Sequence, residues 1–562
     1  MTDGLIARVA LQAQRNPHQP AVVGIRESGG ADVWDWQRLW QQSGRVAALL
    51  LRLGVRPREA VAWQLVNSPE FVAITLGVLR AGAVCCPLMP IFRERELGYM
   101  LARARARVLF VAGRFRARDL VQETAAFIGR LPQLQQVIVI GNGNGSDGGS
   151  SSSGGSGSGH GAERPPRSGL PADTPGVTWR CYDEALAQRL DGDAPLPVMP
   201  FDAPAQLLFT SGTTGEPKGV VHRHDVLLQA VTLEAQHLRL SAADRIYVPS
   251  PLAHQTGFLY GMWLALSLGA TQIVQEHWDA ARGLAALRDW GGTFVQAATP
   301  FLMDLSQAVE QGEEAPRALR IFVATGAAVP RAVARRAGQL LNTHVCGAFG
   351  TTEGCLATLS SPEDPPEKAW GTDGRALGPV RIRVCDDDGH VLPPGREGHY
   401  QTNSPTMFEG YLDAPEATAA AYTADGWYRT GDLAVIDADG YLHVTGRVKD
   451  VVNRGGEKIP VAEVEQLLYQ HEAVKEVAIV AMPDPRLGER ACAFVVLHAG
   501  ARLDLRGMQE YLDRHHMAKQ YWPERLELVE SLPRTPSGKI QKYALREVAS
   551  AFRTADKTGT HP

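Results

Sequence analysis

The sequence predicts an α/β protein with a large N-terminal α/β domain and a smaller C-terminal α+β domain. The chain has 562 residues, which is too many for a single hydrophobic core. Short apolar runs alternate with helical patterns through most of its length, a pattern typical of parallel sheets covered by helices. After residue 430 the pattern changes to hairpins, which indicates a second domain.

The N-terminal part contains strand-like runs separated by helix-like segments. Residues 68–82 form an apolar segment of helical length that lies between two short strand-like runs, AVAWQLV at 60–66 and AVCCPLMP at 83–90. Further strand-like runs are RVLFVAG at 107–113 and RIFVATG at 320–326. Strands that alternate with helices of this length predict largely parallel sheets.

Residues 141–169 differ in composition from the rest of the chain, because they are rich in Gly and Ser. Such a segment buries too little apolar surface to offset its ordering entropy. It could be an interdomain linker. However, a strand pattern precedes it and a strand and helix pattern follows it at 177–190, so a disordered surface insertion within one domain is favoured.

The C-terminal part begins with a predicted hairpin, in which DADG at 437–440 forms the turn before YLHVTGR at 441–447. Helix and strand patterns follow at 460–471, 473–484, 491–500 and 504–515. We therefore expect an N-terminal domain of residues 1–445 and a C-terminal domain of residues 446–562.

Composition excludes several classes of protein. Lys and Arg number 57 against 61 Asp and Glu, so no basic field is available for a nucleic-acid partner. Seven cysteines without a C-x-x-C pair favour neither a disulfide scaffold nor a zinc ribbon. No apolar run approaches the about 20 residues of a membrane span, and the N-terminus lacks a signal-peptide pattern. We expect a cytoplasmic protein.

The strongest local pattern is TSGTTGEPKG at 210–219. Glycines present backbone N–H groups, hydroxyls add donors and a lysine adds positive charge, which together suit a polyphosphate. The Walker A pattern fails, because Pro217 and Gly219 stand where it needs Gly and Ser or Thr. A strand on each side predicts a hairpin loop. The candidate ATP contacts are Thr210, Ser211, Gly212, Thr213, Thr214, Gly215 and Lys218.

This loop resembles the signature of the adenylate-forming superfamily, which comprises acyl-CoA synthetases, peptide-synthetase adenylation domains and beetle luciferases. Four further motifs resemble those of the family and occur in the same order: GAFGTTEG at 347–354, GWYRTGDLA at 426–434, GRVKDVVNRGGEKIP at 446–460 and PRTPSGKI at 533–540. The resemblance covers the chain except the Gly/Ser segment. It implies activation of a carboxylate by ATP and Mg²⁺, followed by acyl transfer to a thiol such as that of coenzyme A.

The resemblance assigns roles to individual residues. Lys539 matches the catalytic lysine that bridges the substrate carboxylate and the α-phosphate, a charge whose loss by acylation would stop the reaction. Glu353 matches the Mg²⁺ carboxylate, although on spacing alone it could equally cap a helix. Asp432 matches the residue that accepts the ribose hydroxyls. The remaining implied ATP contacts are Thr352, Arg447, Gly326 and Ala327.

The resemblance also implies motion of the C-terminal domain between the two half-reactions. Lys449 occupies the position of the hinge residue, about which this mobile domain would rotate and withdraw Lys539. Gly455 and Gly456 would line the tunnel for the pantetheine arm of coenzyme A, because glycine permits close approach.

The acid substrate is predicted from PLAHQTGFLYG at 251–261. Peptide-synthetase domains that activate amino acids carry an Asp in this motif, and here no acidic residue is present, so a hydrophobic acid is favoured. His254 resembles the gating residue and joins the catalytic set, although a structurally satisfied imidazole is an equal alternative. The predicted acyl pocket is His254, Gly257, Phe258, Phe349 and Gly350.

These residues predict an AMP-forming acyl-CoA ligase for a medium-chain, alicyclic or aryl carboxylate. One alternative is a stand-alone adenylating enzyme that loads the phosphopantetheine of a separate carrier protein. A second alternative is a luciferase-like or noncatalytic member of the family. Retention of Lys539, Glu353 and Asp432 argues against a noncatalytic protein.

Overall fold

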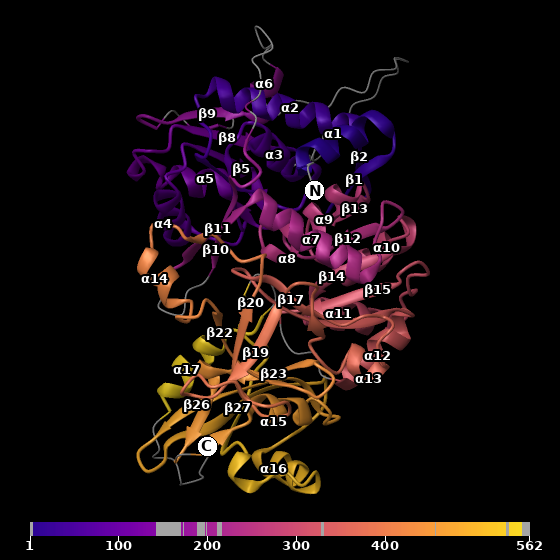
Figure 1. Ribbon diagram of the computed structural model, residues 1–562, viewed down its shortest axis with the longest axis vertical. Coiled ribbons are helices and arrows are strands. Elements are labelled where there is room, and N and C mark those ends of the chain that lie inside the picture. Colours follow the sequence, from indigo (N-terminus) through magenta and orange to yellow (C-terminus); the bar gives the residue numbers. More distant parts are fainter. Residues whose placement is uncertain are drawn as a thin grey trace. The chain divides into compact units, whose positions relative to one another are not determined.

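The computed structural model describes residues 4–141, 170–171, 174–187, 197, 199–210, 216–326, 331–455, 457–535 and 539–552 (Figure 1). Beyond Gly141, the predicted Gly/Ser insertion lies outside these residues. The chain forms two compact units. Unit 1 comprises residues 1–235, 239–293 and 406–417, and unit 2 comprises residues 236–238, 294–405 and 418–562.

An eight-stranded sheet lies in unit 1. Its strands are β3 (Ala60–Gln64), β4 (Val84–Leu88), β5 (Val108–Ala112), β8 (Gln136–Ile140), β9 (Thr178–Cys181), β10 (Pro204–Thr210), β11 (Lys218–Arg223) and β21 (Gly410–Tyr411). They are ordered β21-β11-β10-β4-β3-β5-β8-β9 and are parallel from β10 to β9. Because β8 and β9 pair directly, one sheet continues across the Gly/Ser segment, as the sequence predicted.

Unit 1 also contains a second group of strands and the helices of the N-terminal part. The strands are β1 (Pro20–Ile25), β2 (Ala31–Asp35), β12 (Arg245–Val248) and β13 (Thr271–Gln275), ordered β12-β13-β1-β2, with a short pair β6 (Arg114–Phe115) and β7 (Arg118–Asp119). The helices are α1 (Leu5–Arg15), α2 (Trp36–Arg52), α3 (Pro69–Arg80), α4 (Glu94–Ala104), α5 (Leu120–Ala125), η1 (Ile128–Arg130), α6 (Tyr182–Ala187), α7 (His224–Leu238), α8 (Gln255–Gly257), η3 (Phe258–Trp263), α9 (Leu264–Leu268) and α10 (Ala280–Asp289). The last three residues of α7 are assigned to unit 2.

Helix α3 shows how the sequence sets these boundaries. Ser68 caps it by accepting the Phe71 N–H at 3.3 Å, and Pro69 occupies its first turn, where no N–H partner is needed. The helix is buried almost throughout, and Phe71 packs edge-on against Trp63 of β3 with ring centroids 5.5 Å apart. The predicted strand, helix and strand over residues 60–90 are confirmed.

Unit 2 begins with a mixed group of strands. These are β14 (Phe294–Ala298), β15 (Ile321–Thr325), β16 (His344–Thr351), β17 (Cys355–Leu359) and β18 (Arg375–Ala376), with helices α11 (Thr299–Glu310), α12 (Arg331–Leu341) and α13 (Pro366–Ala369). Strands β14, β15 and β16 are parallel, and β17 and β18 continue the order antiparallel.

The rest of unit 2 contains two antiparallel-rich sheets. The first is β19 (Arg381–Cys385), β20 (Gly398–Asn403), β22 (Tyr428–Ile436) and β23 (Leu442–Arg447). The second is β24 (Val452–Arg454), β25 (Glu457–Ile459), β26 (Val474–Asp484), β27 (Gly488–Leu497) and β28 (Arg525–Leu528). The helices are α14 (Pro415–Ala420), which starts at the end of unit 1, η4 (Val448–Asp450), α15 (Val461–Leu468), α16 (Leu505–Arg514), η5 (Lys519–Tyr521) and α17 (Lys542–Ser550).

The strand pair β26 and β27 is buried on both faces. On β26, Val477 and Ile479 pack into one apolar cluster, which includes residues of α15 and α16. Ala478 and Val480 face the opposite cluster, which includes Leu545 of α17. This alternation follows from the two-residue period of a strand. The predicted C-terminal α+β arrangement is therefore confirmed.

Within the described residues, no helix combines the length and apolarity that crossing a membrane requires.

Candidate functional site

The two ends of the predicted phosphate loop lie on neighbouring strands of unit 1. Thr210 ends β10 and pairs directly with Lys218, which begins antiparallel β11. The candidates Ser211, Gly212, Thr213, Thr214 and Gly215 lie outside the described residues. The loop joins two strands and does not lead into a helix, which confirms that it is not a Walker A loop.

Glu216 and Lys218, at the C-terminal end of this loop, interact with neighbouring elements of unit 1. The Lys218 ammonium lies 4.7 Å from the ring centroid of Tyr411 on β21, within cation–π range. Glu216 forms a hydrogen bond with Tyr99 of α4, and burial followed by the Glu216 charge raises the pKa of that tyrosine. Arg103 of the same helix donates to the carbonyl of Leu412 at 3.1 Å.

In unit 2, the predicted ribose residue Asp432 pairs with Arg447. The two face each other on β22 and β23, and Arg447 Nε donates to Asp432 Oδ1 at 3.0 Å. The Asp432 side chain is 3% exposed, whereas that of Arg447 is 59% exposed. Burial raises the pKa of Asp432, and the charges of Arg447 and Lys539 oppose this rise. Asp432 Oδ2 has no partner among the residues described.

Lys539 lies near the same pair. The backbone N–H of Lys539 donates to the Thr535 hydroxyl at 3.0 Å, and its backbone carbonyl accepts the Thr535 N–H at 2.7 Å. Burial lowers the pKa of Lys539 to about 8, and the positive charge of Arg447 adds to this, while Asp432 and Glu353 act in the opposite direction. The structure therefore places three other predicted residues of unit 2, Arg447, Asp432 and Glu353, within electrostatic range of Lys539. We call these four residues the lysine cluster.

Gly326 follows β15 with φ of +85°, in the region that favours glycine. A Cβ atom there would lie 2.8 Å from Cε of Lys539. Gly326 therefore touches the lysine stem, a role that the sequence did not suggest. Ala327, its predicted partner in the nucleotide pocket, lies outside the described residues.

Glu353 and Thr352 lie in the turn between β16 and β17, where the Gly354 N–H donates to the Thr351 hydroxyl at 2.9 Å. The Glu353 charge acts on Lys539 and also raises the pKa of Tyr422, after the larger effect of burial on that tyrosine. The Glu353 carboxylate thus lies within electrostatic range of Lys539 and Tyr422. It occupies a turn and does not cap a helix.

The predicted acyl residues divide between the units. In unit 1, His254 caps α8, and its Nδ1 accepts the Thr256 N–H at 3.3 Å. Gly257 is required locally, since a Cβ would lie 2.3 Å from the Pro251 carbonyl oxygen. Phe258 is fully buried at the start of η3, a π-helical segment, a form frequent at functional sites.

In unit 2, Phe349 and Gly350 lie on β16. The Phe349 ring packs edge-on against Tyr400, with centroids 5.0 Å apart. A Cβ on Gly350 would lie 2.6 Å from the Cys355 carbonyl oxygen of β17, so the hairpin itself requires this glycine. A pocket formed by all five acyl residues stays a prediction.

The predicted hinge and tunnel residues lie in unit 2. Lys449 is exposed in the 3₁₀ turn η4, between β23 and β24. Its carbonyl accepts a hydrogen bond from Arg546 of α17, which also pairs with Asp450 at 3.1 Å. Gly455 has φ of +62° and donates its N–H to the Leu487 carbonyl at 2.7 Å. Gly456 lies outside the described residues.

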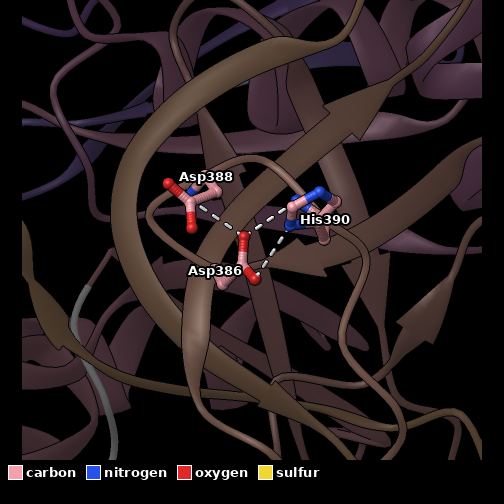
Figure 2. A group of neighbouring side chains, drawn as sticks. All are labelled: Asp386, Asp388 and His390. Carbon is pink, nitrogen blue, oxygen red and sulfur yellow. Dashed lines mark hydrogen bonds and ion pairs between the residues drawn. The ribbon is translucent and has the colours of Figure 1, made fainter.

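Figure 2 shows Asp386, Asp388 and His390, whose ligand atoms lie within 4.8 Å of one another. Asp386 Oδ1 accepts the N–H groups of Asp388 at 3.0 Å and His390 at 2.8 Å. The hydrogen bond from the His390 N–H is the main reason why the pKa of Asp386 is lowered. The group is an exposed turn stabilised by its own hydrogen bonds, and we assign no metal to it.

Two residues beside Asp432 were missed at the sequence level. The charge of Asp432 adds to the effect of burial in raising the pKa of Asp373 and that of Tyr400, so both residues lie near it. The only local signal for Asp373 was its place in the glycine-flanked string GTDGR at 371–375. Nothing in the string HYQT at 399–402 distinguished Tyr400 from an ordinary strand residue.

Together these features define a class of protein. A hydroxyl-rich hairpin loop followed by a lysine in one unit, and a lysine among carboxylates in the other, are typical of enzymes that bind a nucleoside triphosphate and react at its phosphates. The comparisons with known proteins identify the family.

Residues 9–412 match the family model described as AMP-binding enzyme, and residues 463–539 match the AMP-binding enzyme C-terminal domain. The chain therefore belongs to the AMP-binding enzymes, the adenylate-forming superfamily that its motifs predicted. It has the fold of this family, with a large N-terminal domain and a small C-terminal domain.

The chain is 35% identical to a medium-chain fatty-acid–CoA ligase of Escherichia coli, over 94% of this chain and 88% of that protein. It is 33% identical to a salicyl-AMP ligase / salicyl-S-ArCP synthetase of Mycobacterium tuberculosis, over 95% and 88%. Among solved structures, ATP-bound MatB from Rhodopseudomonas palustris matches with a TM-score of 0.82 and 26% identity, over 98% and 99% of the two chains.

Proposed function

We propose that this protein is an AMP-forming acyl-CoA ligase that activates a hydrophobic carboxylate with ATP and transfers the acyl group to coenzyme A. The observation that carries the proposal is the convergence of Lys539, Asp432, Arg447 and Glu353 in unit 2. Ligation to coenzyme A is also the activity named for the E. coli relative.

In the first half-reaction, a carboxylate oxygen attacks the α-phosphorus of ATP and pyrophosphate leaves. Two anions must approach each other, so positive charge at the reacting atoms lowers the barrier. The Lys539 ammonium supplies this charge, and the end of its side chain lies next to Gly326. Asp432 is already aligned by Arg447 at 3.0 Å and has a second oxygen available for a ribose hydroxyl.

The donor chemistry of Glu353 fits Mg²⁺, because this ion prefers hard oxygen ligands and is bound largely through substrate phosphates. Its carboxylate lies within electrostatic range of Lys539. Mg²⁺ would supply further positive charge at the phosphates. In unit 1, Thr210 and Lys218 flank the loop that we assign to the phosphates of ATP.

The proposed acid is medium-chain, alicyclic or aryl. The motif at 251–261 contains no acidic residue, and its Phe258 packs near Trp263 in a fully buried environment. An apolar tail suits such surroundings, since a buried unpaired charge would be costly. The E. coli relative is named for medium-chain fatty acids, and the M. tuberculosis relative for an aryl acid.

For the second half-reaction we propose a boundary between residues 445 and 446, with rotation about Lys449. This residue is exposed in a 3₁₀ turn that separates the four-stranded sheet from the five-stranded sheet. After the rotation, the segment with Gly455 and Gly456 would admit the pantetheine arm of coenzyme A.

AMP release over a panel of carboxylates, with and without coenzyme A, tests this function. Hexanoate, cyclohexanecarboxylate and benzoate represent the three proposed acid classes. We expect thiol-dependent AMP formation with at least one of them. The absence of AMP and of pyrophosphate exchange with every acid would refute the enzyme assignment.

A second candidate is a stand-alone adenylating enzyme that loads a carrier protein. It is favoured by the M. tuberculosis relative, whose name includes salicyl-S-ArCP synthetase. Turnover with a phosphopantetheinylated carrier and none with free coenzyme A would decide for it. A luciferase-like reaction would instead require oxygen and produce light from the adenylate.

We also propose a reducing, cytoplasmic setting. None of the seven cysteines forms a disulfide in the structure, which describes all of them, and six of them are buried. Disulfides are common in oxidising compartments and rare in the cytosol.

A further inference from the structure

Asp373 is fixed between two sheets of unit 2 by three hydrogen bonds. Its N–H donates to the Leu442 carbonyl at 2.8 Å, and its carbonyl accepts the Thr358 hydroxyl at 2.5 Å. Its side-chain Oδ2 accepts the Val444 N–H at 2.8 Å. The Thr358 side chain of β17 and backbone groups of β23 thus determine where this residue and its carboxyl lie.

Two titratable side chains of neighbouring strands, Asp432 and Tyr400, lie near the Asp373 carboxyl. Asp432 of β22 is 3% exposed, and Tyr400 of β20 is 1% exposed. Within the part of the chain that the structure describes, Asp432 Oδ2 and Tyr400 Oη both lack hydrogen-bond partners. Burial, followed by the charges of Asp373 and Asp432, raises the pKa of Tyr400. Its phenol therefore stays neutral beside two carboxyls.

Asp432 and Asp373 differ in the neighbouring groups that stabilise the negative charge of each carboxyl. Asp432 has Arg447 at 3.0 Å and Lys539 nearby. For Asp373, the one contact among the described residues that stabilises the charged form is the Val444 N–H, while the Asp432 charge acts against ionisation. Burial and that charge raise the pKa of Asp373 to about 7. A large fraction of the molecules therefore carry a proton on Asp373 near neutral pH, while the negative charge lies on Asp432, which has the cationic neighbours.

We propose that Asp373 is a positioning residue for ATP, whose neutral form keeps a single negative charge on the ribose-binding carboxyl Asp432. When the Asp373 O–H bond breaks and the proton passes to solvent, a second negative charge lies beside the nucleotide. This charge repels the phosphates and weakens ATP binding. The inference rests on the proposed function, in which Asp432 binds the ribose.

Calorimetric titration with MgATP, without an acid substrate, tests the inference at pH 6.5, 7.5 and 8.5. The Asp373→Asn variant keeps an oxygen acceptor for the Val444 N–H but cannot ionise. From pH 6.5 to 8.5, we expect the wild-type Kd to rise about three- to tenfold more than that of Asp373→Asn, because like charges repel at short range. The titration of ATP itself is common to both proteins and cancels in the ratio.

Asp425→Asn is the matched control. Asp425 lies just before β22 and pairs with Arg383 at 2.7 Å, which lowers its pKa to about 2. It does not titrate in the measured range, so this variant should follow the wild-type profile. Identical profiles for wild type and Asp373→Asn would overturn the inference. No binding of ATP at any pH would instead overturn the proposed function.

A second measurement needs no substitution at Asp373. In the Lys539→Ala variant, the nearby amine that also titrates is absent. ATP binding at pH 7.0, measured in buffers of different ionisation enthalpy, should then take up a substantial fraction of a proton. ATP binding without proton uptake would contradict the inference even if Asp373→Asn failed to fold.

Discussion

Lys218 in the phosphate hairpin of unit 1, residues 204–223, and Lys539 in unit 2 have different electrostatic surroundings. Lys218 lies 4.7 Å from the centre of the neutral Tyr411 ring. Lys539 lies among Arg447, Asp432 and Glu353, and burial lowers its pKa to about 8. The first lysine has a neutral neighbour, whereas the second is sensitive to pH and to the charge of what binds. We infer that the first serves binding and the second serves reaction.

Removal of Lys539 should produce the largest difference between the two regions. We expect Lys539→Ala to reduce adenylate formation by about 10³-fold, the scale of losing a main charge-stabilising group, while thioester formation from supplied acyl-AMP is largely retained. Pyrophosphate exchange and a thioester assay measure the two steps separately. Lys542→Ala, which removes the ion pair with Glu465 at 2.7 Å, is the control. Equal loss of both half-reactions would contradict the assignment.

The same contrast explains which features could be predicted from the sequence. The phosphate hairpin is a contiguous motif between two strands, so its residues and its strand, loop and strand form were predictable from residues 204–223. Lys539, Glu353 and Asp432 were identified only through resemblance to a family, because each lies in a different segment.

Contacts between distant residues were not predictable. Asp373 is bound by Val444, which lies 71 residues further along the chain. Gly326 meets the stem of Lys539, although its local pattern indicated only the end of a strand. Packing of elements brings these residues together, and no spacing within a single segment reports it.

Gly326→Ala should weaken the lysine cluster without removing a charge. The added methyl group would lie 2.8 Å from Lys539 Cε, so the ammonium would have to move from the position that we propose for it beside the α-phosphate. Displacement of about 1 Å can cost about 10²-fold, so we expect a 10- to 100-fold loss of adenylate formation and a largely unchanged thioester step.

Gly440→Ala is the matched control for backbone strain. Gly440 has φ of +83°, close to the +85° of Gly326, and no atom lies within 4 Å of its added Cβ. Both variants therefore carry the same conformational cost. If both lose adenylate formation to the same extent, strain and not contact with Lys539 is responsible.

The pH profile should also distinguish the two regions. The proposed mechanism uses the protonated form of Lys539, whose pKa is about 8, so adenylate formation should fall as the pH rises above 8. We expect kcat/KM for ATP to drop by about tenfold for each further pH unit, since this quantity reports the free enzyme. The decline should persist in Asp373→Asn. A flat profile between pH 8 and 9.5 would contradict this role of Lys539.

The smallest effect is expected at Tyr411 in unit 1. Tyr411→Leu keeps the backbone pairing of β21 with β11 but removes the ring beside the Lys218 ammonium. A cation–π contact at a partly exposed site contributes about 0.5–1 kcal/mol, so KM for ATP should rise about two- to fivefold with kcat nearly unchanged. Tyr411→Phe retains the ring face and should behave like the wild type. If Tyr411→Phe instead matches Tyr411→Leu, the hydroxyl and not the ring orients Lys218. If kcat falls in both, Lys218 acts in the reaction as Lys539 does, and the division between binding and reaction fails.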